Sequence, residues 1–134
     1  MNRLKYLLDT DTVIYFFKGR GRVAQRLLQT APAEVALSTL SLYELHVGVV
    51  RSVRPDETQA QLETFLTLIT VVPFDDAAAR AAAEVRGYLE RSGQTIGMLD
   101  TLIAGVALAR GLTLVTHNVS EFQRVPNLLI EDWY

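Results

Sequence analysis

Apolar and polar residues follow one another along the chain in two spacings, one typical of strands and one typical of helices. Short continuous apolar runs predict buried strands at residues 4–8, 35–37, 71–72, 112–115 and 128–130. Between these runs, apolar residues recur at the spacing that lines one face of a helix, as in the series Leu62, Phe65, Leu66 and Ile69. Strands and helices are therefore expected to alternate.

Capping residues and glycines indicate where further helices begin and end. Asp75 is placed to cap an alanine-rich helix that stops at Gly93. A following helix is predicted through Leu99 and Val106 as far as Gly111. Two shorter helices are expected between residues 11 and 30, divided near a pair of glycines.

This alternation predicts an α/β fold with a mainly parallel sheet that helices cover on both faces, because parallel strands need crossover connections. No repeat, low-complexity tract or long linker interrupts the pattern, and 134 residues suit a single domain over residues 1–134. In such sheets ligands bind beyond the carboxyl ends of the strands. Functional residues are therefore expected at the edge of the sheet where the carboxyl ends of the strands lie.

The composition narrows the classes of protein that the chain can belong to. It has no cysteine, which excludes disulfides, thiolate zinc sites and cysteine nucleophiles. No apolar run approaches the length of a membrane span or of a signal peptide's apolar segment. We therefore expect a cytoplasmic protein without a membrane segment.

Charge does not favour a broad nucleic-acid-binding surface, since the formal net charge is −2. A local basic group nevertheless lies beside two glycines; its members are Lys18, Arg20, Arg22 and Arg26. Arginine suits phosphate because its planar group donates two hydrogen bonds at once. A solvated loop and a charged helix face explain the same group equally well.

Acidic and amide side chains follow several of the predicted strands. Asp9 and Asp11 come directly after the first strand, and Glu44 is expected in the first turn of the helix after the second. Asp100 opens the helix that precedes the fourth strand, and Asn118 follows that strand, with Glu121 one turn further on. These oxygen ligands are all expected at one edge of the sheet.

Each of these residues also has a purely structural interpretation. Asp9 and Asp11 suit turns or helix caps, and Asn118 suits a turn. Ser41 with Glu44 fits a capping box, and Asp100 can be a helix cap. Independent caps have no reason to converge, however, and neighbouring carboxylates repel one another unless a cation neutralises them. Oxygen ligands favour Mg²⁺ or Mn²⁺. Of the two histidines, His46 is expected to point elsewhere, and His117 is a lesser candidate for substrate contact.

Four blocks of sequence, in order, resemble PIN-domain toxins of the VapBC toxin–antitoxin type. Residues 7–11 (L-L-D-T-D) resemble the family's opening L-D-T-N/D, and residues 41–48 (S-L-Y-E-L-H-V-G) its T/S-x-x-E-L-x-x-G. Residues 96–105 (I-G-M-L-D-T-L-I-A-G) resemble I-G-P-x-D-x-x-I-A-G/A. Residues 114–122 (L-V-T-H-N-V-S-E-F) and 130–133 (I-E-D-W) resemble the closing T-x-N/D-x-x-x-F and E-D-W. The resemblance covers nearly the whole chain.

The resemblance implies a three-layer α/β/α PIN domain with five parallel strands and a homodimer. It implies an endoribonuclease toxin that inhibits translation, in which Asp9, Glu44 and Asp100 hold Mg²⁺ or Mn²⁺ and Asn118 completes the catalytic group. It also implies a VapB-like antitoxin as partner and RNA as substrate, with the anticodon stem-loop of initiator tRNA as the preferred candidate. The apolar side chains around Phe16, Phe17, Tyr43, Leu62 and Phe65 exceed what a small core needs, so some are expected to form a groove for the antitoxin; the alternative is that all of them belong to the core.

Two positions, Met98 and Val106, depart from the residues that the closest toxins carry, and a third, Asn118, fits the family's pattern with asparagine in place of aspartate. Asn118 stands where other members carry aspartate, which weakens the expected hold on a second metal ion. Met98 and Val106 replace a proline and a histidine that flank Asp100. The resemblance therefore does not predict how stiff the loop before Asp100 is, or which substrate contacts it makes.

Two other classes of function remain as alternatives. Asp9-Thr10-Asp11-Thr12-Val13 also fits the opening motif of haloacid-dehalogenase-type phosphatases, but that chemistry needs a downstream lysine, and the only lysines are Lys5 and Lys18. The other alternative is a PIN-like module that binds a regulator without cleaving anything. Three acids that repel one another argue against such a module.

Overall fold

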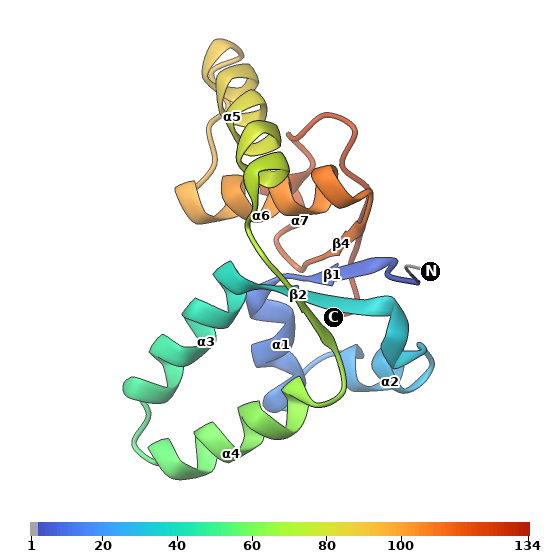
Figure 1. Ribbon diagram of the computed structural model, residues 1–134, viewed down its shortest axis with the longest axis vertical. Helices are drawn as coiled ribbons and strands as arrows, with labels where there is room; N and C mark the ends of the chain where they lie inside the picture. Colours follow the sequence, from blue (N-terminus) through green and yellow to red (C-terminus); the bar gives the residue numbers. More distant parts are fainter. Residues whose placement is uncertain (1–2) are drawn as a thin grey trace.

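A computed structural model describes residues 3–134, in which strands and helices alternate as predicted (Figure 1). The strands are β1 (Tyr6–Leu8), β2 (Val35–Ser38), β3 (Thr70–Val72), β4 (Thr113–Val115) and β5 (Ile130–Glu131). The helices are α1 (Thr10–Phe17), α2 (Val23–Leu28), α3 (Thr39–Val50), α4 (Pro55–Leu66), α5 (Asp76–Arg91), α6 (Met98–Arg110) and α7 (Val119–Phe122). A short 3₁₀ helix at Pro32–Glu34 leads into β2.

The five strands form one sheet in the order β3-β2-β1-β4-β5, and every neighbouring pair is parallel. Leu8 at the end of β1 is in register with Leu37 of β2 and Val115 of β4. The predicted five parallel strands are therefore confirmed, although β1, β4 and β5 are shorter than the apolar runs that predicted them.

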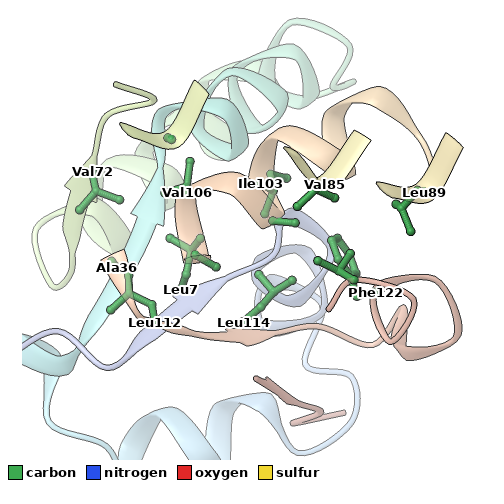
Figure 2. Packing of buried hydrophobic residues seen from close by; sticks show 14 residues of the cluster. Leu7, Ala36, Val72, Val85, Leu89, Ile103, Val106, Leu112, Leu114 and Phe122 are labelled. Atoms are coloured by element: carbon green, nitrogen blue, oxygen red, sulfur yellow. The ribbon is translucent and has the colours of Figure 1, made fainter. Parts of the chain in front are cut away.

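Successive strand residues face opposite sides of the sheet and so supply two cores. Leu7, Ala36 and Leu114 pack in the first core against apolar residues of α5, α6 and α7, as Figure 2 shows. Their neighbours Leu8 and Val115 pack in the second core against residues of α1, α2, α3 and α4. Because both faces of the strands are buried, the runs are apolar without alternation. The result is the expected α/β/α arrangement of three layers.

Two details differ from the prediction. The helix predicted through Ile69 ends at Leu66, and Ile69 lies just before β3 while still packing against the second core. Leu62 and Phe65 are buried there with 1% and 3% of their surface exposed, so they belong to the core. In residues 3–134, no helix is long and apolar enough to cross a membrane.

Gly105 allows α5 and α6 to pack closely, which gives the first testable prediction. A Cβ added at Gly105 would lie 2.6 Å from Ala82 Cβ and 2.7 Å from the Ala78 carbonyl oxygen. We expect Gly105→Ala to lower the free energy of unfolding by about 1–3 kcal/mol, since overpacking outweighs the better helix propensity of alanine.

Gly48→Ala is the matched control, because a Cβ at this exposed position of α3 meets nothing within 4 Å. It should raise the free energy of unfolding by about 0.5–1 kcal/mol. Urea unfolding of the two variants measures both effects. Equal stabilisation by both substitutions would show that α5 and α6 are not closely packed at Gly105.

Candidate active site

The chain changes direction across the sheet at β1, which makes the carboxyl ends of β1 and β4 the place where a crevice is expected. From β1 the chain passes outward through β2 to β3, and it then returns to β4 on the other side of β1. Open α/β sheets bind ligands at such a switch point. Asp9 follows β1 and Thr116 follows β4, so both lie at this point.

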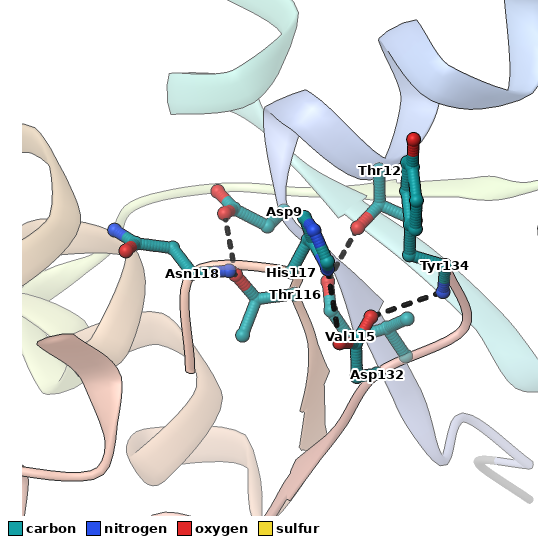
Figure 3. Close-up of polar contacts among 8 residues, drawn as sticks. All are labelled: Asp9, Thr12, Val115, Thr116, His117, Asn118, Asp132 and Tyr134. Carbon is teal, nitrogen blue, oxygen red and sulfur yellow. Dashed lines mark hydrogen bonds and ion pairs between the residues drawn. The ribbon is translucent and has the colours of Figure 1, made fainter. Parts of the chain in front are cut away.

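Asp9 is held in place by both of its carboxylate oxygens. It is the N-cap of α1, where Oδ1 accepts a hydrogen bond of 2.9 Å from the Thr10 backbone N–H. Oδ2 accepts a hydrogen bond of 2.8 Å from the Thr116 hydroxyl (Figure 3). The cap interpretation of Asp9 is thus correct, and it leaves Asp9 95% buried in contact with the neighbouring strand.

Glu44 lies one turn further into its helix than the sequence predicted. The predicted capping box of Ser41 with Glu44 is wrong, because β2 runs directly into α3 and Ser38 is the N-cap. The Ser38 hydroxyl accepts a hydrogen bond of 3.1 Å from the Ser41 N–H. Glu44 instead reaches the first helix, where Oε1 accepts a short hydrogen bond from the Thr10 hydroxyl. This contact links α3 to the first residue of α1.

Asp100 is not a helix cap. Helix α6 begins at Met98, and its N-cap is Gly97, which has no side chain to cap the free N–H groups. The Asp100 carboxylate instead lies within reach of Asn118, whose Nδ2 is 3.5 Å from Asp100 Oδ2 and donates to Glu121 Oε2 at 3.2 Å. Asn118 therefore links two acids as a donor in this arrangement.

The pKa values show that the predicted acids influence one another. The pKa of Asp9 is raised to about 7, chiefly by burial and then by the charges of Asp100 and Asp11, while the hydrogen bonds from Thr116 and Thr10 oppose the shift. Burial is also the main cause that raises the pKa of Asp100 to about 6, followed by the charges of Glu121, Glu44 and Asp11. The acids that the sequence placed at one edge of the sheet are therefore close enough to repel one another.

Asp9, Glu44 and Asp100 offer oxygen donors alone, which suits a hard divalent cation. In residues 3–134, none of them forms a salt bridge with a lysine, arginine or histidine, so their negative charge is uncompensated. No three acids or histidines of that region are close enough to enclose one ion as they stand. The chemistry of the donors fits Mg²⁺ or Mn²⁺, and the side chains would have to draw together around it.

Several members of the site were not among the predicted site residues. The hydroxyls of Thr10 and Thr116 orient Glu44 and Asp9, and the only signal for them was their position beside the acids. Glu121 was placed near the edge of the sheet, but its contact with Asn118 makes it part of the acidic group. Asp11 is exposed yet raises the pKa of both Asp9 and Asp100.

The two departures near Asp100 have different surroundings. Val106 is fully buried in the first core, so this side chain packs inside the fold and does not contact substrate. Met98 is 73% exposed in the first turn of α6, two residues before Asp100. His46 is exposed, whereas His117 contacts Asp132 and two tyrosines.

Comparison with known proteins places the chain in a family. The family model of the PIN domain matches residues 6–128. The tRNA(fMet)-specific endonuclease VapC of Salmonella typhimurium is 35% identical over 97% of this chain and 98% of its own length. Among solved structures, DNA-bound VapBC from Salmonella typhimurium matches with a TM-score of 0.92 at 36% identity, covering 98% of this chain and 99% of that one.

VapBC2 from Rickettsia felis, bound to a DNA fragment from its promoter, matches with a TM-score of 0.91 at 34% identity over 98% of this chain and all of that one. The family match, the relatives and the parallel sheet with acids at its switch point agree with one another. The chain therefore belongs to the PIN-domain family, and within it to the VapC proteins of VapBC toxin–antitoxin systems.

Proposed function

We propose that the protein is a Mg²⁺- or Mn²⁺-dependent endoribonuclease toxin. The observation that carries the proposal is the buried Asp9 carboxylate, which lies near Asp100 and has no cationic partner within residues 3–134. A buried acid in that setting is costly unless a cation binds there. Relatives named ribonuclease VapC and tRNA(fMet)-specific endonuclease VapC support RNA as the substrate.

Asp9, Glu44 and Asp100 would hold the ion. When bound, Mg²⁺ or Mn²⁺ supplies positive charge that activates a water and stabilises the leaving oxygen in phosphodiester cleavage. Thr116 and Thr10 keep Asp9 and Glu44 in fixed orientations through hydrogen bonds to their carboxylate oxygens. The Asn118 amide nitrogen lies between the carboxylates of Asp100 and Glu121. We propose that Asn118 completes the catalytic group.

The proposed substrate is a tRNA, with the anticodon stem-loop of initiator tRNA as the first candidate, because relatives from Salmonella typhimurium and Shigella flexneri carry the name tRNA(fMet)-specific endonuclease. The test is incubation of purified protein with total tRNA, with Mn²⁺ and with chelator, followed by sequencing of the new 5′ ends. New 5′ ends at defined positions, formed with Mn²⁺ but not with chelator, would support the proposal. Intact RNA under both conditions would refute it.

The phosphatase alternative requires a lysine beside the acids, and neither lysine of the chain lies there. Lys5 lies just before β1, at the opposite end of the strand from Asp9, and pairs with Glu34 at 3.0 Å. Lys18 caps the far end of α1, two turns away from Asp9. The binding-module alternative is disfavoured because it leaves the uncompensated carboxylates at the switch point without a purpose.

We further propose that an antitoxin segment binds in the groove between α1, α3 and α4. This groove measures about 390 Å³ and has a mixed lining. Its apolar residues are Ile14, Phe17, Leu45, Val49 and the buried Leu62, and its polar or charged residues are Lys18, Glu44, Thr58 and Gln61. A segment that packs on the apolar residues of this groove would also lie next to Glu44 of the acidic site. The comparison with VapBC complexes supports a partner of this kind. By analogy with these relatives, we also propose that the toxin is a homodimer.

Co-expression with the product of the neighbouring antitoxin gene is expected to give a complex without ribonuclease activity. Gly48→Phe should weaken that complex at least about tenfold, because Gly48 lines the groove and its Cβ direction is open. Affinity co-purification and titration calorimetry measure the effect. The matched control is Gly87→Phe on α5, which lies outside the groove. Equal affinity of both variants would place the antitoxin elsewhere.

A further inference from the structure

A group of three rings, two of them exposed and one half-buried, lies beside the acids and has no role in the chemistry proposed above. We call it the aromatic cluster and define it as Tyr15, His117 and Tyr134. The His117 and Tyr134 rings stack with their centroids 4.2 Å apart and their planes inclined by 21°. Tyr15 meets both rings edge-on, with centroids 5.7 Å from His117 and 4.9 Å from Tyr134. Three segments that are far apart in the sequence thus meet in one cluster.

The stacked pair is both fixed and open to solvent. Asp132 Oδ2 lies 3.0 Å from His117 Nδ1, and Asp132 Oδ1 accepts a hydrogen bond of 3.0 Å from the Tyr134 N–H (Figure 3). Nevertheless 41% of Tyr134 and 44% of the His117 side chain remain exposed. Rings that are already ordered lose little conformational entropy when a planar ligand binds on them.

The cluster is joined directly to the acidic site. His117 follows Thr116, which donates to Asp9, and precedes Asn118, which lies beside Asp100. Tyr15 lies on α1, the helix that Asp9 caps. If a phosphate of an RNA strand lies at the acids, the adjoining nucleotides of that strand therefore lie close to the rings.

Basic residues lie in the segment that packs against the cluster. The loop between α1 and α2 packs against Tyr134, since a Cβ at Gly21 would lie 2.7 Å from the Tyr134 carbonyl carbon. Lys18, Arg20 and Arg22 of this loop region are exposed, and within residues 3–134 none of them forms a salt bridge. Unpaired arginines next to exposed rings match the mixture of phosphate and base in a nucleic-acid strand.

We propose that the aromatic cluster is a nucleobase-binding subsite, on which a base next to the cleaved phosphate stacks while Arg20 and Arg22 contact the neighbouring backbone. The inference rests on the proposed ribonuclease function and names the part of the chain that positions the RNA. Because every base has a flat π face, the subsite accepts single-stranded RNA with little dependence on sequence. Cleavage specificity must then arise elsewhere.

The experiment measures binding of a short fluorescein-labelled single-stranded RNA by anisotropy, in chelator so that nothing is cut. Tyr134→Leu keeps apolar packing but removes the ring, and we expect it to weaken binding at least about fivefold, the smaller end of base stacking on an aromatic side chain. Tyr134→Phe should bind within about twofold of wild type because the ring remains. Tyr88→Leu, at an exposed tyrosine of α5, is the matched control and should bind like wild type.

Two further measurements identify the contact. Arg22→Ala should reduce the slope of log affinity against log salt concentration by about one if Arg22 contacts a phosphate. Photocrosslinking of RNA that contains 4-thiouridine, followed by mass spectrometry, should label peptides with Tyr134 or His117.

Equal RNA affinity of wild type and Tyr134→Leu, or no measurable binding by wild type, would overturn the inference. So would loss of the antitoxin complex by Tyr134→Leu with unchanged RNA binding, since the cluster would then be a protein contact. The binding assay needs no cleavage, so it can succeed or fail independently of the proposed catalysis. Failure of the wild type to cut RNA in Mn²⁺ is the separate result that refutes the ribonuclease function.

Discussion

Asp9→Asn is expected to lower the rate of RNA cleavage more than about 100-fold while the protein keeps its fold, because the charge that would hold the ion is lost. The hydrogen-bond pattern allows this replacement. The asparagine oxygen can still accept from the Thr10 N–H, and its amide can donate to the Thr116 hydroxyl, which now donates to Asp9. Expression of the variant should also no longer arrest growth.

Cleavage is measured with purified protein and tRNA in excess Mn²⁺, and circular dichroism verifies the fold. Asp76→Asn is the matched control: Asp76 is an exposed aspartate of α5 whose carboxylate pairs with Arg80 at 2.8 Å. This variant should cleave like wild type. A folded Asp9→Asn protein that cuts RNA at the wild-type rate would show that Asp9 holds no catalytic ion.

The layers of the fold could be predicted because buried parallel strands are apolar on both faces. Leu7 and Leu8 enter different cores, and so do Leu114 and Val115, which is why their segments appear as unbroken apolar runs. The order of the strands was not predicted from spacing. It depends on pairings such as Leu8 with Val115, which are distant in the sequence.

The acids could be predicted because carboxyl ends of parallel strands meet at one edge, but their local settings could not. Ser38 and Ser41 are both good N-caps, and only the end of β2 at Ser38 decides that this residue caps α3. Glu44 therefore contacts Thr10 rather than its own helix start. The aromatic cluster depends on the packing of residues 132–134 beside α1 and has no periodic signature in the sequence.

Asp100→Asn should raise the melting temperature of metal-free protein by about 3–6 °C at a pH of about 8. The folded state raises the pKa of Asp100 from 3.8 to about 6, so between these values it binds more protons than the unfolded state does. Stability is therefore full below a pH of about 4 and falls as the pH rises through about 6. Above that range the charged carboxylate destabilises the fold by about 1–2 kcal/mol, after allowance for solvent at this half-buried group.

The change in stability on adding metal shows whether Asp100 binds the ion or is only an acid in the first turn of a helix. Mn²⁺ at about 100 times its dissociation constant should stabilise wild type by about 2.7 kcal/mol, because the ion binds only the folded state, and the variant should gain much less. An acid that acted only on the helix dipole would give the opposite sign, since Asp100→Asn would then cost about 0.3–1 kcal/mol without metal. Asp76→Asn, in the first turn of α5, is the control for that behaviour. Thermal melts of the three proteins in chelator and in Mn²⁺ decide the matter: an equal metal response in wild type and Asp100→Asn would remove Asp100 from the site.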